Sequence, residues 1–211
     1  NLIVAALALL TVACQPQVDR FTLKGRISQA DGKMLYLDHL ALDKIEIIDS
    51  VKLDAQGEFN FNPVAPKECF DFYRLRIDGK VINLSIDSTE TVTVTANEPI
   101  MQTIYTVEGS ENCLRLKELV MRQRDLKQDL RNLGMNFTGN DIKKLESQIS
   151  EMVDVFKSEL LTDFILPEPG SPYAYYALFM SLHGQMIFNP QTNRQDAKCY
   201  AAVATQMDIK Y

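Results

Sequence analysis

The chain has 211 residues, of which 46% are hydrophobic and 24% are charged, and its formal net charge at pH 7 is -6. This composition is typical of a globular protein and excludes a disordered or collagen-like chain. General nucleic-acid binding needs a basic face, so the acidic balance predicts that nucleic acid is not a partner.

The opening segment, NLIVAALALLTVAC, carries no charged residue. An apolar run of roughly 7 to 15 residues that ends in small residues is typical of a secretory signal peptide, whereas a membrane span needs about 20. The basic start and the initiator Met of a signal peptide are missing. We therefore expect residues 1–13 to be a signal peptide truncated at its start; the alternative is a buried first helix or strand.

The stretch Thr11-Val12-Ala13-Cys14 resembles the lipobox of bacterial lipoproteins, although Thr11 stands where Leu is usual. The resemblance implies that Cys14 is the lipid attachment site and becomes the first residue after cleavage. Two or more acyl chains hold a protein firmly on a bilayer. We expect a lipidated Cys and spacer over residues 14–18, and a periplasm-facing protein anchored to a membrane of the bacterial cell envelope.

Residues 19–110 are predicted to be a β domain, because eight short segments alternate apolar and polar residues at roughly ten-residue spacing. Asp31-Gly32 and Asp78-Gly79 are hairpin-turn signals. The pattern indicates an antiparallel β-sandwich or barrel. The segments are RFTLKGRIS, KMLYLDHL, KIEIIDSVKL, DAQGEFNFNPV, FDFYRLRID, KVINLSID, TVTVTA and TIYTVEG.

Residues 111–165 change to a helical period and are predicted to form an antiparallel helical hairpin. Ser110 is placed to cap the first helix and Gly134 to end it. The predicted seam consists of Leu116, Leu119, Leu126, Leu130 and Leu133 on the first arm, with Gln123 as a polar interruption, and Ile142, Leu145, Ile149, Met152, Phe156 and Leu160 on the second.

Residues 171–211 are predicted to form C-terminal helices. After a Pro-rich break at 166–170, Ser171-Pro172 is a helix start, and this helix is expected to reach Gly184. A last helix is expected around RQDAKCYAAVATQM, truncated before a further domain. The predicted fold class is therefore α+β with segregated β and helical parts.

Neither the remaining cysteines nor the two histidines form a motif of redox or metal chemistry. Cys69, Cys113 and Cys199 include no C-x-x-C pair, and a disulfide among them is left open. For Cys199 we favour a buried small hydrophobe. His39, on a strand, and His183, near a helix C-terminus, are too few for a zinc site, so no metal or cofactor is predicted.

Several carboxylates border the predicted strands, and the sequence does not exclude a glycosidase-type pair among them. Turn aspartates that accept hydrogen bonds from their own backbone are commoner, and we favour that interpretation. Phosphate loops, nucleophile elbows and zinc-protease motifs are missing from the sequence, so no catalytic residue is predicted. The carboxylates that border the predicted strands are Asp49, Asp54, Asp78, Asp87 and Glu90.

An aromatic group at helical spacing begins the C-terminal part. Core packing is the default interpretation of such a group, and a docking face for another domain is the alternative. The residues are Tyr173, Tyr175, Tyr176 and Phe179.

The β region resembles an uncharacterised all-β domain at the N-terminus of TlpA-like and AhpC/TSA-like thioredoxin-fold lipoproteins of Gram-negative anaerobes. The resemblance covers roughly residues 19–165, with a weaker match through Pro172 to Met207. The segments that carry the resemblance are FTLKGRI, GKMLYLD, Asp49-Ser50, GEFNF, the LSID to TVTV stretch and VEGSEN. At one position the sequence departs from the family, because Asp87-Ser88 stands where the family often has a Gly-Asp turn.

The resemblance implies a non-catalytic, membrane-anchored module that positions a downstream thioredoxin-like domain bearing W-C-x-x-C, in a periplasmic thiol–disulfide oxidoreductase. That motif does not occur in these 211 residues, which leaves enzyme activity undecided. The alternatives are a stand-alone envelope lipoprotein whose β-sandwich binds a ligand or partner, and a hydrolase. Homo-oligomerisation is left open.

Overall fold

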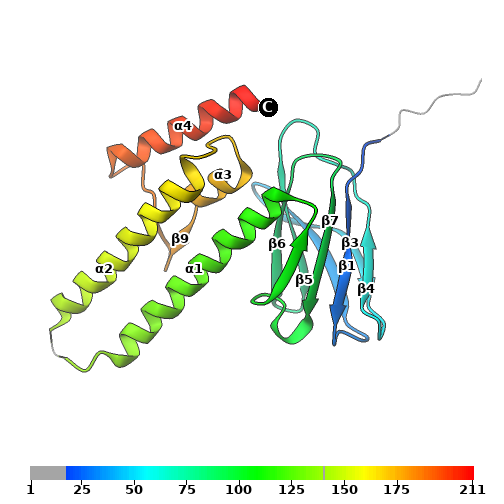
Figure 1. Ribbon diagram of the computed structural model, residues 1–211, viewed down its shortest axis with the longest axis horizontal. Coiled ribbons are helices and arrows are strands. Elements are labelled where there is room, and N and C mark those ends of the chain that lie inside the picture. The colour runs from blue at the N-terminus through cyan, green and yellow to red at the C-terminus, as the bar shows by residue number, and fades with distance from the viewer. Residues whose placement is uncertain (1–17, 140) are drawn as a thin grey trace, which may run out of the picture.

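Eight strands form where the sequence alternates apolar and polar residues, and helices follow them, which confirms the predicted fold class. The computed structural model describes residues 18–139 and 141–211. The strands form two four-stranded sheets packed face to face, and the helices lie to one side (Figure 1). The sheets do not close into a barrel, so of the two predicted architectures the sandwich is the one that forms.

The first sheet has the order β4-β1-β7-β8 and the second has the order β3-β2-β5-β6. Their inward-facing side chains, including Phe21, Leu23, Leu75 and Val92, fill the space between the sheets. In sheet order, the strands span Glu58–Phe61, Thr22–Ser28, Thr91–Asn97 and Tyr105–Glu108 in the first sheet, and Ile45–Lys52, Met34–Leu40, Asp71–Ile77 and Lys80–Ile86 in the second.

One pair of neighbouring strands departs from the expected antiparallel pattern. Strands β1 and β7 are parallel, whereas the other pairs of neighbours in the two sheets are antiparallel. Gly25 in β1 has a φ of +151°, and a Cβ added there would lie 1.8 Å from the carbonyl oxygen of Val94 in β7. Only glycine fits this approach.

Helix α1 (Glu111–Asn136) begins where the sequence predicted, because the Ser110 side chain accepts a hydrogen bond from the Cys113 backbone N–H. The helix lies along the side of the sandwich where β6 and β8 are the sheet edges. Cys113 Sγ donates to Ser85 O at 3.2 Å, and Lys117 Nζ donates to Tyr105 O at 2.6 Å. A short 3₁₀ turn, η1 (Glu98–Ile100), lies between β7 and β8.

The prediction that Gly134 ends the first helix is wrong, since α1 continues to Asn136. Gly134 is exposed, so no packing contact forces the chain to turn there. A second helix, α2 (Ile142–Glu159), returns towards the sandwich and runs into a π-helical turn, η2 (Leu160–Ile165). The two arms form the predicted hairpin (Figure 1).

Burial along the predicted hairpin seam differs between the two arms. On α1, Leu116, Leu119, Leu126 and Leu130 are buried, whereas on the second arm burial is limited to Phe156 and to Leu160 at the start of η2. Towards the tip, by contrast, Ile142 is 65% exposed.

The C-terminal part starts as predicted and then differs. Helix α3 (Pro172–Leu178) begins at Ser171, whose side chain accepts from Ala174 N. It ends at Leu178 rather than at Gly184, and the next residues form a hairpin of β9 (Ser181–Leu182) and β10 (Gln185–Met186). The hairpin buries apolar side chains in the core of the helical part, and this burial outweighs the helical pattern of the segment. The buried side chains are Met180, Leu182, Ile187 and Phe188. Helix α4 (Arg194–Lys210) completes the described chain.

Candidate functional site

Aromatic side chains join the sandwich to the helical part. Phe72 of β5 lies with its ring centroid 5.7 Å from that of Tyr176 and 6.2 Å from that of Tyr175, both on α3. Phe70, just before β5, contacts Tyr175 at 5.7 Å and the last residue, Tyr211, at 5.8 Å. Aromatic pairs in these geometries add to the stability obtained from area burial alone. The junction therefore fixes α3 and α4 against the second sheet.

The aromatic row continues from the junction to an open apolar pocket between α3 and α4. Tyr175 contacts Phe179 at a centroid distance of 4.8 Å, and Phe179 contacts Tyr200 of α4 at 5.5 Å. Phe179 remains 51% exposed. The pocket has a volume of about 400 Å³ and is lined by Tyr175, Leu178, Phe179, Tyr200, Val203, Ala204, Met207 and Asp208. It is the strongest candidate for a binding or docking site on the helical part.

Hydrogen bonds hold the walls of this pocket in place. The hydroxyl of Tyr200 donates to Leu178 O at 2.7 Å and lies 3.2 Å from Phe188 O. Asp196, which is buried, accepts from Lys157 Nζ at 2.6 Å and from Asn189 N at 2.7 Å. These bonds tie α4 to α2, to α3 and to the segment after β10, so the pocket is preformed.

The structure divides the aromatic group that the sequence singled out. Tyr175 and Phe179 line the pocket and Tyr176 belongs to the junction, whereas Tyr173 is buried and its hydroxyl donates to Glu168 at 2.7 Å. The sequence reasoning missed four partners that are distant in the chain. They are Phe70, Phe72, Tyr200 and Tyr211, and their only sequence signal is that they are aromatic.

The cysteines of the described segments are thiols in surroundings that suppress the thiolate. Cys69, Cys113 and Cys199 are unpaired there. Burial raises the pKa of Cys113 to about 12, and burial also raises the pKa of Cys69 and of Cys199. A thiolate is the nucleophilic form of cysteine, so these residues are poorly suited to thiol–disulfide exchange. Cys199 is half-buried rather than fully buried.

The two histidines lie far apart in the fold and have different settings. His39 lies on β2 as predicted, with Nε2 at 3.3 Å from an Asp71 carboxylate oxygen. His183, predicted near a helix C-terminus, instead lies in the β9–β10 turn with a φ of 49°. Outside residues 1–17 and 140, no group of three or more His, Cys, Asp and Glu side chains is arranged to hold a metal ion.

The carboxylates that border strands act locally in the fold. Asp54 accepts from the backbone N–H groups of Gln56 and Gly57, both at 3.0 Å, which is the turn role that we favoured. Asp49 accepts from the next backbone N–H at 2.7 Å, and Asp78 pairs with Lys33 at 3.3 Å. At the start of α1, Asp87 accepts from Asn112 Nδ2 at 2.9 Å. Burial raises the pKa of Glu90, whose side chain accepts from Asp87 N at 3.3 Å.

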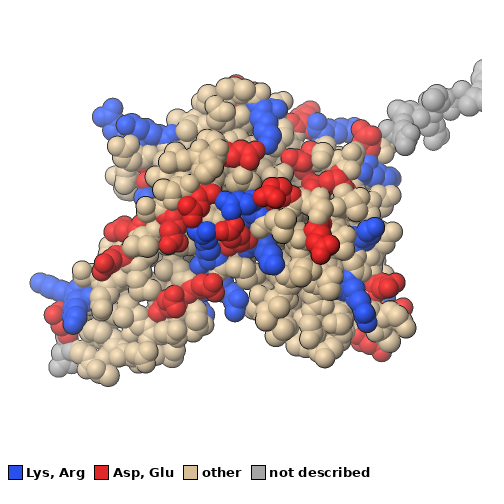
Figure 2. Space-filling view, viewed as in Figure 1, with Lys and Arg blue, Asp and Glu red and all other residues tan. Residues whose placement is uncertain are grey.

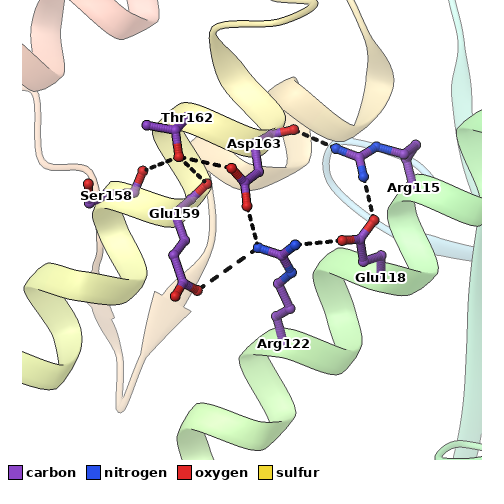
Figure 3. A network of polar contacts seen from close by, with 7 residues as sticks. All are labelled: Arg115, Glu118, Arg122, Ser158, Glu159, Thr162 and Asp163. Carbon is purple, nitrogen blue, oxygen red and sulfur yellow. Dashed lines mark hydrogen bonds and ion pairs between the residues drawn. The ribbon is translucent and has the colours of Figure 1, made fainter.

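A network of ion pairs and hydrogen bonds joins α1 to the end of α2 (Figure 3). Arg122 donates to Asp163 Oδ2 and to Glu118 Oε1, both at 2.6 Å, and lies 4.0 Å from Glu159. Arg115 donates to Glu118 and to the backbone oxygen of Asp163. In the space-filling view, red and blue side chains alternate over this central region (Figure 2). Each charge has a partner, so the network positions the helices.

The predicted lipid attachment site, Cys14, lies outside the described residues. Over residues 18–139 and 141–211, no helix combines the length and hydropathy that a membrane span requires.

Comparison with known proteins assigns the sandwich to a family. Residues 21–113 match a domain of unknown function (DUF4369). A DUF4369 domain is found at these residues. The match covers the eight strands and ends at the first turn of α1, so the helical part lies beyond it. A search of curated proteins finds no match. The DUF4369 domain therefore supplies the sandwich, and the candidate pocket lies in the segment that follows it.

Proposed function

We propose that this chain is the membrane-anchored, non-catalytic N-terminal module of a periplasmic thiol–disulfide oxidoreductase. In this proposal Cys14 carries the lipid, and a thioredoxin-like domain follows Tyr211 in the full-length protein. The observation that carries the proposal is the preformed apolar pocket on α3 and α4, which lies beside the last residue of the chain. The pocket offers a docking face for the domain that follows.

The connection between β4 and β5 brings both ends of the described chain to one edge of the molecule. Ala65 N donates to Asp19 O at 2.9 Å, and five residues later Phe70 packs against Tyr211. Figure 1 shows the first described residues and the C-terminus along the same upper edge. A lipid at Cys14 and a domain after Tyr211 would then lie on the same side, so the module would hold that domain close to the membrane surface.

The surroundings of the cysteines agree with a non-catalytic role for this part. A redox dithiol needs a nucleophilic cysteine with a lowered pKa, whereas the pKa values of Cys69, Cys113 and Cys199 are raised. The exchange reaction would therefore depend on cysteines of the following domain.

The deciding experiment is to read the gene beyond the codon for Tyr211 and to assay the full-length protein for disulfide reduction. We expect a W-C-x-x-C motif and an activity that is lost when its first Cys is replaced by Ser. A stop codon soon after Tyr211 would overturn the proposal. Anchoring is tested separately by Cys14→Ser, which should move the protein from the membrane fraction to the soluble fraction; continued membrane partitioning would contradict lipid attachment there.

Docking is tested by hydrogen exchange on α4 in the full-length protein. The following domain should protect the amides of α4, and Phe179→Asp should remove this protection because it places a charge in the pocket. Leu166→Asp is the matched control, since Leu166 is 59% exposed and lies outside the pocket. Equal protection in both variants would show that the domain does not dock on the pocket.

The pocket also favours a second candidate function, a stand-alone envelope lipoprotein that binds an apolar ligand. A volume of about 400 Å³ lies within the usual range of small-molecule pockets. The site would then be in the helical part and not in the sandwich, whose interior is filled by side chains. A stop codon after Tyr211 together with ligand binding that Phe179→Asp abolishes would support this alternative.

A further inference from the structure

The four sheet edges of the sandwich are treated differently by the fold. Helix α1 covers the side formed by β6 and β8, with Lys117 Nζ bonded to a backbone oxygen of β8. On the opposite side, β4 is four residues long and its outward residues are Glu58 and Asn60. Strand β3 is eight residues long, and within the described residues β2 is its only strand neighbour. One long sheet edge is therefore open.

The open edge exposes apolar side chains where an edge strand normally carries charge. Ile45 is 54% exposed, Ile47 is 60% exposed and Ile48 is 43% exposed. Leu42, just before the strand, is fully exposed. An edge strand also presents unpaired backbone N–H and C=O groups, which another strand can satisfy. This combination specifies the chemistry of a partner: an extended strand with apolar side chains.

We propose that two copies of this chain pair through their β3 strands, antiparallel, to form one continuous eight-stranded sheet. An antiparallel pair of identical edges has a twofold axis, so each favourable contact occurs twice. With the axis through Glu46, and with Ile48 bulged out of the ladder as it is against β2, Ile45 of one copy lies opposite Ile47 of the other, and Lys44 lies opposite Asp49. Glu46 faces its own copy, and its charge is offset by Lys44 of the same chain. Opposite charges and apolar pairs at facing positions stabilise antiparallel strands.

Features of the edge limit pairing in other registers. The register of β3 with β2 shifts at a β-bulge, where Ile48 has no facing residue. Lys44 and Lys52 stand at the two ends of the strand. Bulges and edge lysines discourage indiscriminate strand addition. The edge is therefore selective for a strand of complementary charge, and a second copy of β3 supplies one.

The pairing does not depend on the proposed anchor or on the following domain. We would test it by sedimentation velocity over a concentration series on the full chain carrying Cys14→Ser, so that lipid cannot join the molecules. The expected result is a dimer, and Ile47→Lys should weaken it by at least about tenfold. Ile47 is exposed, so the variant should fold. Ile104→Lys, at a position that is 67% exposed but far from β3, is the matched control and should leave the dimer intact.

A charge exchange tests the register. Lys44→Glu and Asp49→Lys should each weaken the dimer, and the double variant should restore it. A monomer at every concentration, or a dimer that Ile47→Lys does not affect, would overturn the proposal, as would failure of the double variant to recover association. An insensitive dimer would point instead to another surface, such as the α3–α4 pocket.

Discussion

The sandwich and the helical hairpin are stabilised in different ways. Between the sheets, large side chains such as Phe21 and Leu23 are completely buried. In the hairpin, the outer part of α2 is exposed, with Ile142 at 65%, and Arg115 and Arg122 join the two arms near the sandwich. The comparison teaches that the sandwich depends on apolar packing, whereas the hairpin also depends on polar contacts at its base.

Removing a large side chain from the sandwich core should have the greatest effect. Phe21 is fully buried, and its ring centroid lies 5.0 Å from that of Tyr73. Phe21→Ala should lower the free energy of unfolding by about 3–5 kcal/mol, because it removes buried apolar surface and leaves a cavity. Chemical denaturation followed by circular dichroism measures the change. Leu145→Ala in the half-buried part of the hairpin is the comparison, and an equal loss there would contradict the difference between the regions.

The loss of the buried charge of Asp38 in the sandwich should also be costly. Asp38 is fully buried and accepts from Arg74 at 2.8 Å and from Arg76 at 2.7 and 3.0 Å. Asp38→Asn should lower the free energy of unfolding by about 3 kcal/mol at neutral pH, since both arginines lose their carboxylate.

This charge also predicts a dependence on pH. Burial acts to raise the pKa of Asp38, but hydrogen bonds from Arg76 and Arg74 more than offset it, so the pKa lies below its ordinary value. The carboxylate therefore stabilises the fold above the unfolded-state pKa of about 3.9, and this contribution is lost as the pH falls through the lower folded-state value. The difference in free energy of unfolding between wild type and Asp38→Asn should become smaller as the pH is lowered. A difference that stays constant with pH would contradict this explanation.

At the base of the hairpin a smaller effect is expected. Arg122 is 32% exposed, so its ion pairs are partly screened by solvent. Arg122→Met should lower the free energy of unfolding by about 1 kcal/mol or less, and high salt should reduce the difference. Arg124→Met is a suitable control, because Arg124 is exposed and, within the described residues, its side chain makes no ion pair and donates one hydrogen bond, to Met121 Sδ at 3.9 Å. Similar losses in the two variants would show that the network does not stabilise the hairpin.

The smallest change is a gain in stability near the hairpin tip. Gly134 lies within α1, and a Cβ added there meets no heavy atom within 4 Å. Gly134→Ala should raise the free energy of unfolding by about 0.5–1 kcal/mol, because alanine loses less conformational entropy in a helix. A loss of stability would indicate that the helix ends at Gly134 in solution.

Much of the fold could be predicted because its signals are local. Alternating residues located the eight strands, and Ser110 and Ser171 located two helix starts through their capping hydrogen bonds. The β9–β10 hairpin was missed because the segment continues a helical pattern. Its available signal was His183-Gly184, where both residues have positive φ, as a tight hairpin turn requires.

The candidate site was less predictable than the fold. Tyr175 and Phe179 were identified as a group that could form a docking face, and both line the pocket. Phe70, Tyr200 and Tyr211 could not be added, because only folding brings residues this far apart in the chain into contact.

The sequence by itself determined the eight strands of the sandwich, the change to helices after Ser110 and the segregation of the two parts, because periodicity and capping act over a few residues. The tertiary structure alone decided the parallel pairing of β1 and β7, the exposure of the predicted seam residues at the start of α2, and the uncovered sheet edge at β3. Each depends on which distant segment lies alongside, and that choice is made by burial of the whole core rather than by any local pattern.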